Sequence, residues 1–291
     1  MSLENPMRLI HTFNRIYVIE SLPSGKTGQA LFDHILMWAH VRLGTLKSKL
    51  FQPASIAEFL QALAEIEEHA RTFNTAPIIH IEAHGDKNGI MLANGERLDW
   101  ENLYAHFVAI NISCRNSLFL VMAVCEGAYL GKIISLTRRA PFWGLLGPDA
   151  PVSSEDLYIA FSRFYEEMFR TLDGTSALKA LNAAVSGTTR YVFLNSRKMF
   201  EDAWVLYEKE YCMGKGRLDR VDRILTRQNS ALPNPSFDIT RARKIIKKRF
   251  KETRGPIFSQ YMRLFFMIDL YPENAEKFQV YYPNVLRKAQ K

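Results

Sequence analysis

The feature that most constrains the fold is a strand, helix and strand pattern in the first half of the chain. Residues 76–83 form an apolar run that ends at His84, and residues 117–124 form a second run that ends at Cys125. Residues 98–112 between them have the apolar spacing of a helix. Such a crossover makes the two strands parallel. Because parallel strands open their carboxyl ends at one edge of a sheet, we expect His84 and Cys125 to emerge side by side.

This pair of side chains predicts nucleophilic chemistry, since a thiol beside an imidazole is a nucleophile beside its base. Taken singly, a cysteine at a strand end is more often a small buried side chain, and a histidine there is more often a structural residue. Their coincidence at two neighbouring strand ends favours a functional pair. Gly85 can bring a backbone N–H near a reacting carbonyl, and Gly127 allows a sharp turn after Cys125. Together these residues predict a thiol acyl-transfer site.

The rest of the chain predicts an α/β fold, a mainly parallel sheet with helices on both faces. From about residue 205 no further strands are predicted, and positive charge accumulates. We therefore expect one α/β domain over residues 1–205 and a basic, mostly helical extension over residues 206–291. Further strands are expected at residues 15–20, 90–92, 140–147 and 191–194, and helices at residues 28–43, 55–66, 125–136, 153–168 and 174–185. The candidate caps are Ser55, Asp99, and either Ser153 or Ser154.

Composition suits a soluble protein with a reduced thiol. The net charge of +8 permits an acidic partner without requiring one. Three cysteines do not suggest a disulfide framework, and Cys114 and Cys212 are expected to be inert because no base accompanies them. The first six residues are polar, and no run approaches the roughly 18 apolar residues of a membrane span. We expect no membrane span and a cytoplasmic location, where a free thiol stays active.

The two strand endings also resemble a known family. Residues 78–85 and 118–127 are similar to the caspase-like cysteine peptidases, most closely to their bacterial CHAT-type branch. That family has a hydrophobic strand ending in His-Gly, an intervening segment, and a hydrophobic strand ending in Ala/Ser-Cys-Glu-x-Gly. The resemblance extends over about residues 12–195. The matching residues here are His84-Gly85 and Val124-Cys125-Glu126-Gly127.

The resemblance implies hydrolysis of peptide bonds in a protein or peptide substrate. Cys125 would be the nucleophile and His84 the general base. The backbone N–H groups of Gly85 and Cys125 would hold the oxyanion. Val124 stands where the family has Ala or Ser, which narrows the pocket beside the nucleophile. We expect no cofactor and no metal.

Two further implications concern the substrate and the setting. The walls of the substrate pocket are expected at Asp86, in the loop after the first strand, and at Trp143 and Gly144, in the strand after the nucleophile. Proteins resembling this chain often serve in bacterial immune or stress pathways and are switched on by a sensor protein. The resemblance therefore implies an activating protein partner for a chain that shows no recognisable sensor domain of its own.

Two segments resemble ligand-binding motifs but do not match them. A zinc protease has His-Glu-x-x-His on a helix, whereas His80 and His84 lie on a predicted strand, roughly 13 Å apart and too far for one ion. Residues 23–28 imitate a phosphate-binding loop, but the required first glycine is Glu20, whose charge would repel phosphate. We expect His80 to be a structural strand residue and residues 23–28 to be an ordinary loop.

Two other classes of function stay open beside the peptidase. The first is a catalytically silent scaffold or adaptor that keeps the fold. The second is a nucleic-acid-binding protein that uses the basic run at residues 241–254. The simpler interpretation of this run is a solvated helix face with Ile245, Ile246 and Phe250 packing inward. An acidic protein partner or a nucleic acid is the alternative.

Overall fold

The computed structural model describes residues 13–44, 46–185, 190–231 and 238–282. These residues form two compact units. The first holds the described residues up to Ile134 together with Ala140–Ser196, and the second holds Ser135–Arg139 and the described residues from Arg197 onward. The division falls where helix α7 (Ser196–Tyr207) begins, somewhat before residue 205, at which the sequence placed the end of the α/β domain.

The first unit is built on one sheet. Its strands are β1 (Arg15–Ser21), β2 (Lys47–Phe51), β3 (Pro77–Gly85), β4 (Gly89–Met91), β5 (Arg97–Asp99), β6 (Phe119–Ala123), β7 (Gly144–Pro148) and β8 (Tyr191–Asn195). The main path runs β2-β1-β3-β6-β7-β8. Its first five strands are parallel, and β8 is antiparallel to β7. The short β4–β5 hairpin pairs with the end of β3. The α/β class and the mainly parallel sheet predicted from the sequence are confirmed.

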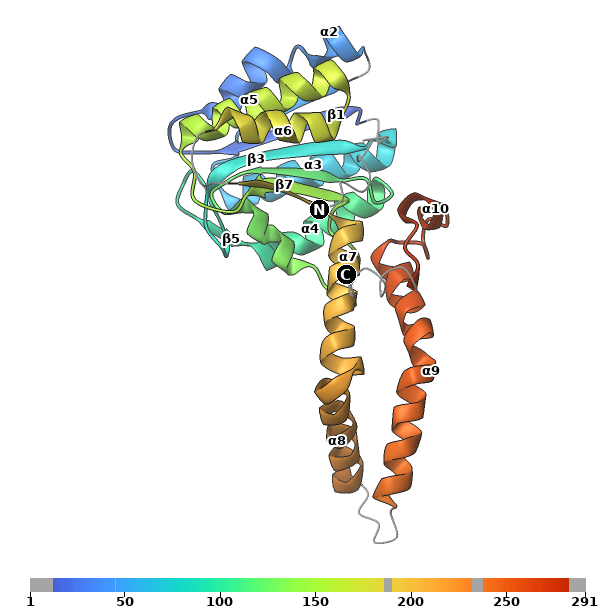
Figure 1. The fold of residues 1–291 in the computed structure, drawn as a ribbon. Coiled ribbons are helices and arrows are strands. Elements are labelled where there is room, and N and C mark those ends of the chain that lie inside the picture. The colour runs from blue at the N-terminus through green and yellow to red at the C-terminus, as the bar shows by residue number, and fades with distance from the viewer. Residues whose placement is uncertain (1–12, 45, 186–189, 232–237, 283–291) are drawn as a thin grey trace. The chain divides into compact units, whose positions relative to one another are not determined.

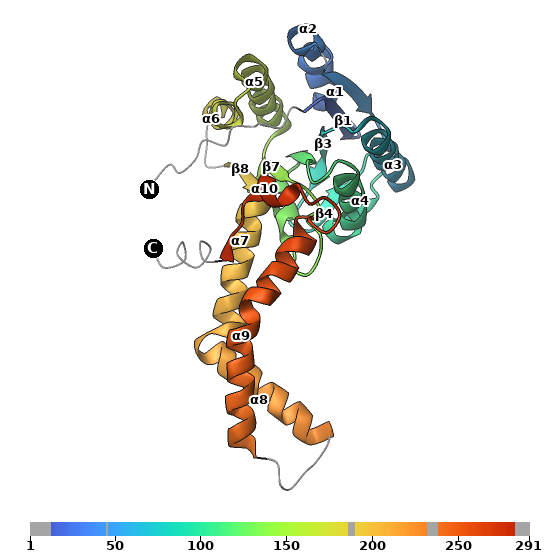
Figure 2. The ribbon, with the colours of Figure 1, turned by 90° about the vertical axis from the view of Figure 1, so that its right-hand side faces the viewer.

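Helices cover both faces of this sheet. They are α1 (Thr27–Leu31), α2 (Ala39–Leu43), α3 (Ile56–Phe73), α4 (Trp100–Ser113), α5 (Ser154–Thr171) and α6 (Gly174–Ala184). A 3-10 helix at Gly127–Ile133 stands in place of the α-helix expected over residues 125–136. Figures 1 and 2 show α1, α2, α5 and α6 on one face and α3 and α4 on the other. The strands are thereby enclosed between two helical layers, which is why a central parallel strand such as β6 is apolar on both sides.

Local sequence explains where these elements begin. Residues 77–83 of β3 are all buried, as a strand between two helical layers requires. The side chains of Ser55, Ser153 and Asp173 accept backbone N–H groups at the starts of α3, α5 and α6. Asp99 occupies the cap position of α4, as predicted, but its side chain makes no capping hydrogen bond. The starts of α3 and α5 could therefore be predicted from the cap residue.

Two local expectations were wrong. Strand β2 was not predicted, because it is a short edge strand whose exposed Lys47 and Lys49 hide the apolar pattern. Charged side chains of this kind are common on edge strands, where they discourage pairing with other chains. The single helix expected over residues 28–43 is instead divided, with a π-helical turn at Phe32–Leu36 between α1 and α2.

The second unit is helical. It contains α7, α8 (Gly214–Ala231), α9 (Ile239–Phe265) and α10 (Asn274–Phe278), with a π-helical turn at Glu208–Cys212 between α7 and α8. Helix α9 returns alongside α7 in the opposite direction (Figure 1). Buried rings join the two helices, since Phe200 lies 5.6 Å from Phe258 and Trp204 lies 5.0 Å from Phe258 between centroids. Arg139 makes a two-point ion pair with Asp269 at 2.8 and 2.6 Å.

Within the described residues, none of these helices has both the length and the apolar character needed to cross a membrane.

Candidate active site

The two strand ends that carry His84 and Cys125 lie beside each other. Strands β3 and β6 are parallel neighbours, and the last residues that pair are Glu82 and Ala123. His84 and Cys125 each stand two residues beyond this pair, where β3 runs on to Gly85 and β6 has given way to a turn. A Cβ atom built on Gly85 would lie 3.6 Å from the Cys125 carbonyl oxygen, which shows that the two segments touch.

Gly85 is required at this point because the neighbouring chain leaves no room for a side chain. A Cβ atom here would lie 2.3 Å from Cγ1 of Val124 and 2.9 Å from the carbonyl oxygen of Gly89. Val124 is fully buried. The Val124 side chain therefore fills the space directly beside Gly85, and the two residues limit how closely the strand ends approach.

The sulfur of Cys125 faces the segment that leads into α5. The Val152 N–H donates to Sγ at 3.4 Å, and the thiol is 3.4 Å from the Val152 carbonyl oxygen, to which it can donate in turn. The side chain is partly exposed. A backbone N–H directed at sulfur is the kind of donor that a thiolate accepts. Val152 was not singled out from the sequence, because the loop after β7 carries no motif.

His84 is placed at the same edge but is not joined to the thiol. Its side chain is exposed, and within the described part of the chain it makes no hydrogen bond, to Cys125 or to any other residue. Catalytic hydrogen bonds in unliganded enzymes are often long and tighten only when substrate binds. The His84 imidazole and the Cys125 thiol therefore lie at one edge of the sheet without a hydrogen bond between them.

The turn after Cys125 is strained and tied to the loop after His84. Glu126 has φ of 58° and ψ of 23°, a left-handed conformation that is uncommon for a residue other than glycine. Its carboxylate lies 3.6 Å from Nζ of Lys87. Gly127 follows, where a Cβ atom would approach Cβ of Met122 to 2.7 Å. The expected sharp turn exists, and its left-handed residue is Glu126, while Gly127 is needed for close packing.

A tyrosine that the sequence did not suggest lies at the same edge. Tyr191 begins β8 opposite Pro148, the carboxyl end of β7. It is buried, and its hydroxyl has no hydrogen-bond partner among the described residues. Burial raises the pKa of the Tyr191 hydroxyl, and the charges of Asp156 and Cys125 raise it further. The sequence did not suggest Tyr191, because only the antiparallel pairing of β8 with β7 brings this residue to the edge.

The expected substrate-pocket residues are not all near Cys125. Trp143 precedes β7, and its N–H donates to the carbonyl of Leu118, seven residues before Cys125. Trp143 and Gly144 thus lie at the amino edge of the sheet, roughly 20 Å of strand from the sulfur. Their assignment to the pocket is corrected, because β7 begins at Gly144 and its carboxyl end, not its start, reaches the site.

Asp86 does follow His84 directly, but its carboxylate is engaged in its own turn. It accepts the N–H of Asn88 at 2.8 Å and a hydrogen bond from Arg97 at 2.8 Å. The Asn88 N–H, followed by Arg97, lowers the pKa of Asp86. Asp86 therefore shapes the loop at the site, and its carboxylate is already paired.

A buried polar network lies behind the site, on the face covered by α1 and α5. His80 is fully buried and contacts Glu82 at 3.0 Å and the Tyr165 hydroxyl at 3.2 Å. Thr27 donates to Glu82. Both ring nitrogens of His80 are thus occupied, as expected of a structural residue. Among the described residues, no group of three or more His, Cys, Asp or Glu side chains is arranged to hold a metal ion.

The loop that imitates a phosphate-binding motif is held by a carboxylate. Oε1 of Glu20 accepts the N–H of Gly28 at 2.8 Å and that of Gln29 at 3.1 Å. Glu20 is itself buried, and Gln52 donates to its other oxygen at 2.9 Å. The N–H groups that would cradle a phosphate are therefore used by the protein itself, which agrees with the expectation of an ordinary loop.

Comparison with known proteins adds no relative: no protein-family model matches the chain, and no curated protein matches it.

Proposed function

We propose that this chain is a caspase-like cysteine endopeptidase that uses Cys125 as nucleophile and His84 as general base. One observation carries the proposal. The parallel pairing of β3 with β6 brings a strand that ends in His-Gly beside a strand that ends in Cys-Glu-x-Gly. Backbone contact between Gly85 and Cys125 supports it, because the two catalytic segments then form one surface.

The proposed reaction proceeds through a thioester. His84 accepts the thiol proton of Cys125, and the thiolate attacks the carbonyl carbon of the scissile peptide. The carbonyl oxygen becomes an oxyanion, which the N–H groups of Gly85 and Cys125 receive. The intermediate collapses as His84 returns its proton to the leaving amine, and the acyl group stays on sulfur. Water, deprotonated by His84, then hydrolyses the thioester and restores the thiol.

The setting of this activity follows from the same proposal. Cys125 is a free thiol, so the enzyme works where thiols stay reduced, as in the cytoplasm. His84 is exposed and unjoined to Cys125 in the free chain, which fits an enzyme whose dyad closes when substrate or an activating protein partner binds. A role in a bacterial immune or stress pathway belongs to this proposal as well.

An active-site thiol probe tests the proposal. A peptide carrying a thiol-reactive electrophile should label Cys125, and peptide cleavage should disappear in Cys125→Ala. His84→Ala should reduce cleavage by about 10²- to 10⁴-fold, the usual contribution of a general base. Cys212→Ser, which alters a buried thiol in the second unit, is the matched control and should keep full activity.

The same variants distinguish the main alternative, a silent scaffold. The absence of a hydrogen bond between His84 and Cys125 in the described residues is the observation that favours it. If Cys125 reacts with the probe no faster than a free thiol, and if replacing His84 changes nothing, the chain is a scaffold and the peptidase proposal fails.

A further inference from the structure

The second unit carries a large excess of positive charge on two helices. Helix α8 has five Lys and Arg residues against two acids, and α9 has nine against one. This excess is larger than the net charge of +8 of the whole chain, so the remainder of the chain is net acidic. The charge is therefore a property of this helical pair and not of the protein's surface in general.

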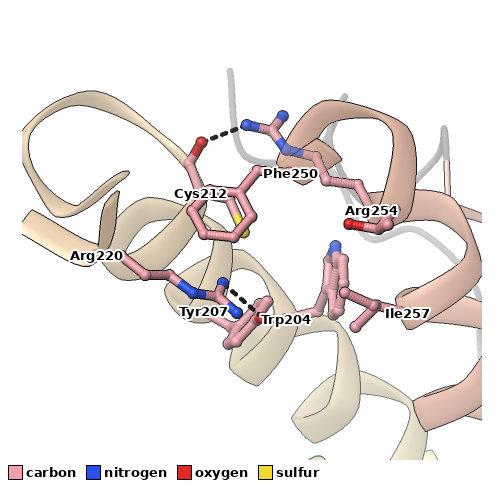
Figure 3. Close-up of a pocket in the computed structure, with 8 residues that line it drawn as sticks. Trp204, Tyr207, Cys212, Arg220, Phe250, Arg254 and Ile257 are labelled. Carbon is pink, nitrogen blue, oxygen red and sulfur yellow. Dashed lines mark hydrogen bonds between the residues drawn. The ribbon is translucent and has the colours of Figure 1, made fainter. Parts of the chain in front are cut away.

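Some of these cations face inward and stabilise the unit. Figure 3 shows Arg220 donating to the Tyr207 hydroxyl and Arg254 donating to the carbonyl of Cys212. Arg220 also lies over the ring of Phe250, 4.5 Å from its centroid. On α8 and α9, Arg243 pairs with Asp222 at 2.7 Å. Arg254 is thus held within the unit, whereas the other cations of α9 are exposed apart from Lys247, which is half-buried.

Four outward cations form a line along α9. Arg241, Lys244, Lys248 and Lys251 recur at intervals of three, four and three residues, which places them on one face of a helix over about 15 Å. All four are exposed. Within the described residues, Lys248 alone of the four has an ion-pair partner, Glu252 at 3.7 Å, and both of those side chains are exposed. We call these four residues the basic stripe.

The surroundings of the basic stripe offer little apolar surface. Protein interfaces concentrate their energy in aromatic and aliphatic anchors, and interfacial helices bury an apolar face in lipid. Here the rings of Phe258 and Phe265 are buried within the unit. The large apolar side chains exposed on the described part of α9 are Ile239 and Ile245, and the exposure of Ile245 corrects the expectation that it packs inward. Because two separate aliphatic side chains do not form an apolar face, we expect charge to dominate recognition of a partner.

We propose that the basic stripe binds the phosphate backbone of nucleic acid without reading its sequence. A regular array of cations with few acids and little exposed apolar surface complements a regular line of phosphates, and such contacts gain free energy by releasing condensed counterions. An acidic protein or an anionic membrane would need a larger apolar face than the separate Ile239 and Ile245 side chains provide. The inference is independent of the peptidase proposal, because no residue of the basic stripe belongs to the site.

Fluorescence anisotropy on the full chain tests the proposal. The probes are a labelled 24-base-pair duplex DNA and a labelled 24-nucleotide single-stranded RNA, titrated between 50 and 200 mM salt. The test variant replaces Arg241, Lys244, Lys248 and Lys251 with Gln. The control replaces Lys47, Arg163, Lys179 and Arg190, four exposed cations of the first unit, with Gln and so lowers the net charge equally.

For duplex DNA, each phosphate contact contributes about −0.9 to the slope of log affinity against log salt. Four contacts therefore predict an affinity loss of about 10²-fold across this salt range for the wild type. The slope should be shallower by about 3 to 4 in the basic-stripe variant and unchanged in the control. Circular dichroism should show both variants folded.

Three results would overturn the proposal. One is no binding by the wild type at 50 mM salt. Another is an equal loss of slope in both variants, which would mean that net charge alone is responsible. The third is competition by poly-glutamate, or binding to phosphatidylserine vesicles, as strong as that of DNA at equal charge concentration. That last result would assign the stripe to an acidic protein or to a membrane.

Discussion

The contact between Gly85 and Val124 gives a quantitative test of how the segments that carry His84 and Cys125 are held together. Val124 is fully buried, and its Cγ1 would lie 2.3 Å from a Cβ atom on Gly85. Val124→Ala removes two methyl-sized groups. At about 0.8 kcal/mol for each, plus a cavity cost, we expect a loss of about 2 kcal/mol in the free energy of unfolding. Gly85→Ala overpacks the same space and should cost about 1 to 3 kcal/mol.

The double variant should be more stable than the sum of the two losses predicts. The methyl group introduced at position 85 would occupy the space that Cγ1 of Val124 vacates, so the clash and the cavity partly cancel. A contact of 2.9 Å with the carbonyl oxygen of Gly89 remains, which keeps the cancellation incomplete. We expect a favourable coupling of about 1 to 2 kcal/mol between the two substitutions.

Urea unfolding followed by circular dichroism measures the four stabilities of this cycle. Gly255→Ala is the matched control, because a Cβ atom there meets nothing within 4 Å, and its effect should add to that of Val124→Ala. Additivity of Gly85→Ala and Val124→Ala within about 0.5 kcal/mol would refute the reasoning. It would mean that the two strand ends are not in the close contact described above.

Three other predictions concern single groups. Iodoacetamide should alkylate Cys125 before Cys212, because Cys212 is buried and burial raises the pKa of its thiol; mass spectrometry of digested protein checks the order. Asp269→Asn should lower the free energy of unfolding at neutral pH by no more than about 1 kcal/mol, because solvent screens the exposed pair with Arg139. The hydrogen bond from Arg139 lowers the pKa of Asp269. The stabilisation is therefore present above the usual aspartate pKa and is lost as pH falls through the lowered value. A difference in the free energy of unfolding between wild type and variant that persists below that lowered pKa would contradict this reasoning. Tyr191→Phe should leave the free energy of unfolding unchanged or slightly raised, because it removes a buried hydroxyl that has no hydrogen-bond partner among the described residues; a loss of more than about 1 kcal/mol in urea unfolding would contradict this.

Much of the first unit could be predicted because its signals are local. A βαβ crossover follows from apolar runs and helical spacing, and its handedness and strand direction follow from chain geometry. His84 and Cys125 could therefore be placed at one edge from sequence position alone. The cap at Ser55, and a serine cap at 153 or 154, could also be predicted, because a hydroxyl before a helix accepts hydrogen bonds from N–H groups two or three residues away.

Other parts of the site depend on pairings between distant segments, which no local pattern encodes. Val152 contacts the Cys125 sulfur, and Tyr191 lies at the same edge of the sheet, only because β7 and β8 join the sheet at particular registers. The same dependence explains the wrong placement of Trp143, since a shift in where β7 begins moves a residue from one edge of the sheet to the other. The sequence by itself determined which two strands carry Cys125 and His84. Only the tertiary structure decided what surrounds the sulfur, because those neighbours are selected by packing across the sheet and not by spacing along the chain.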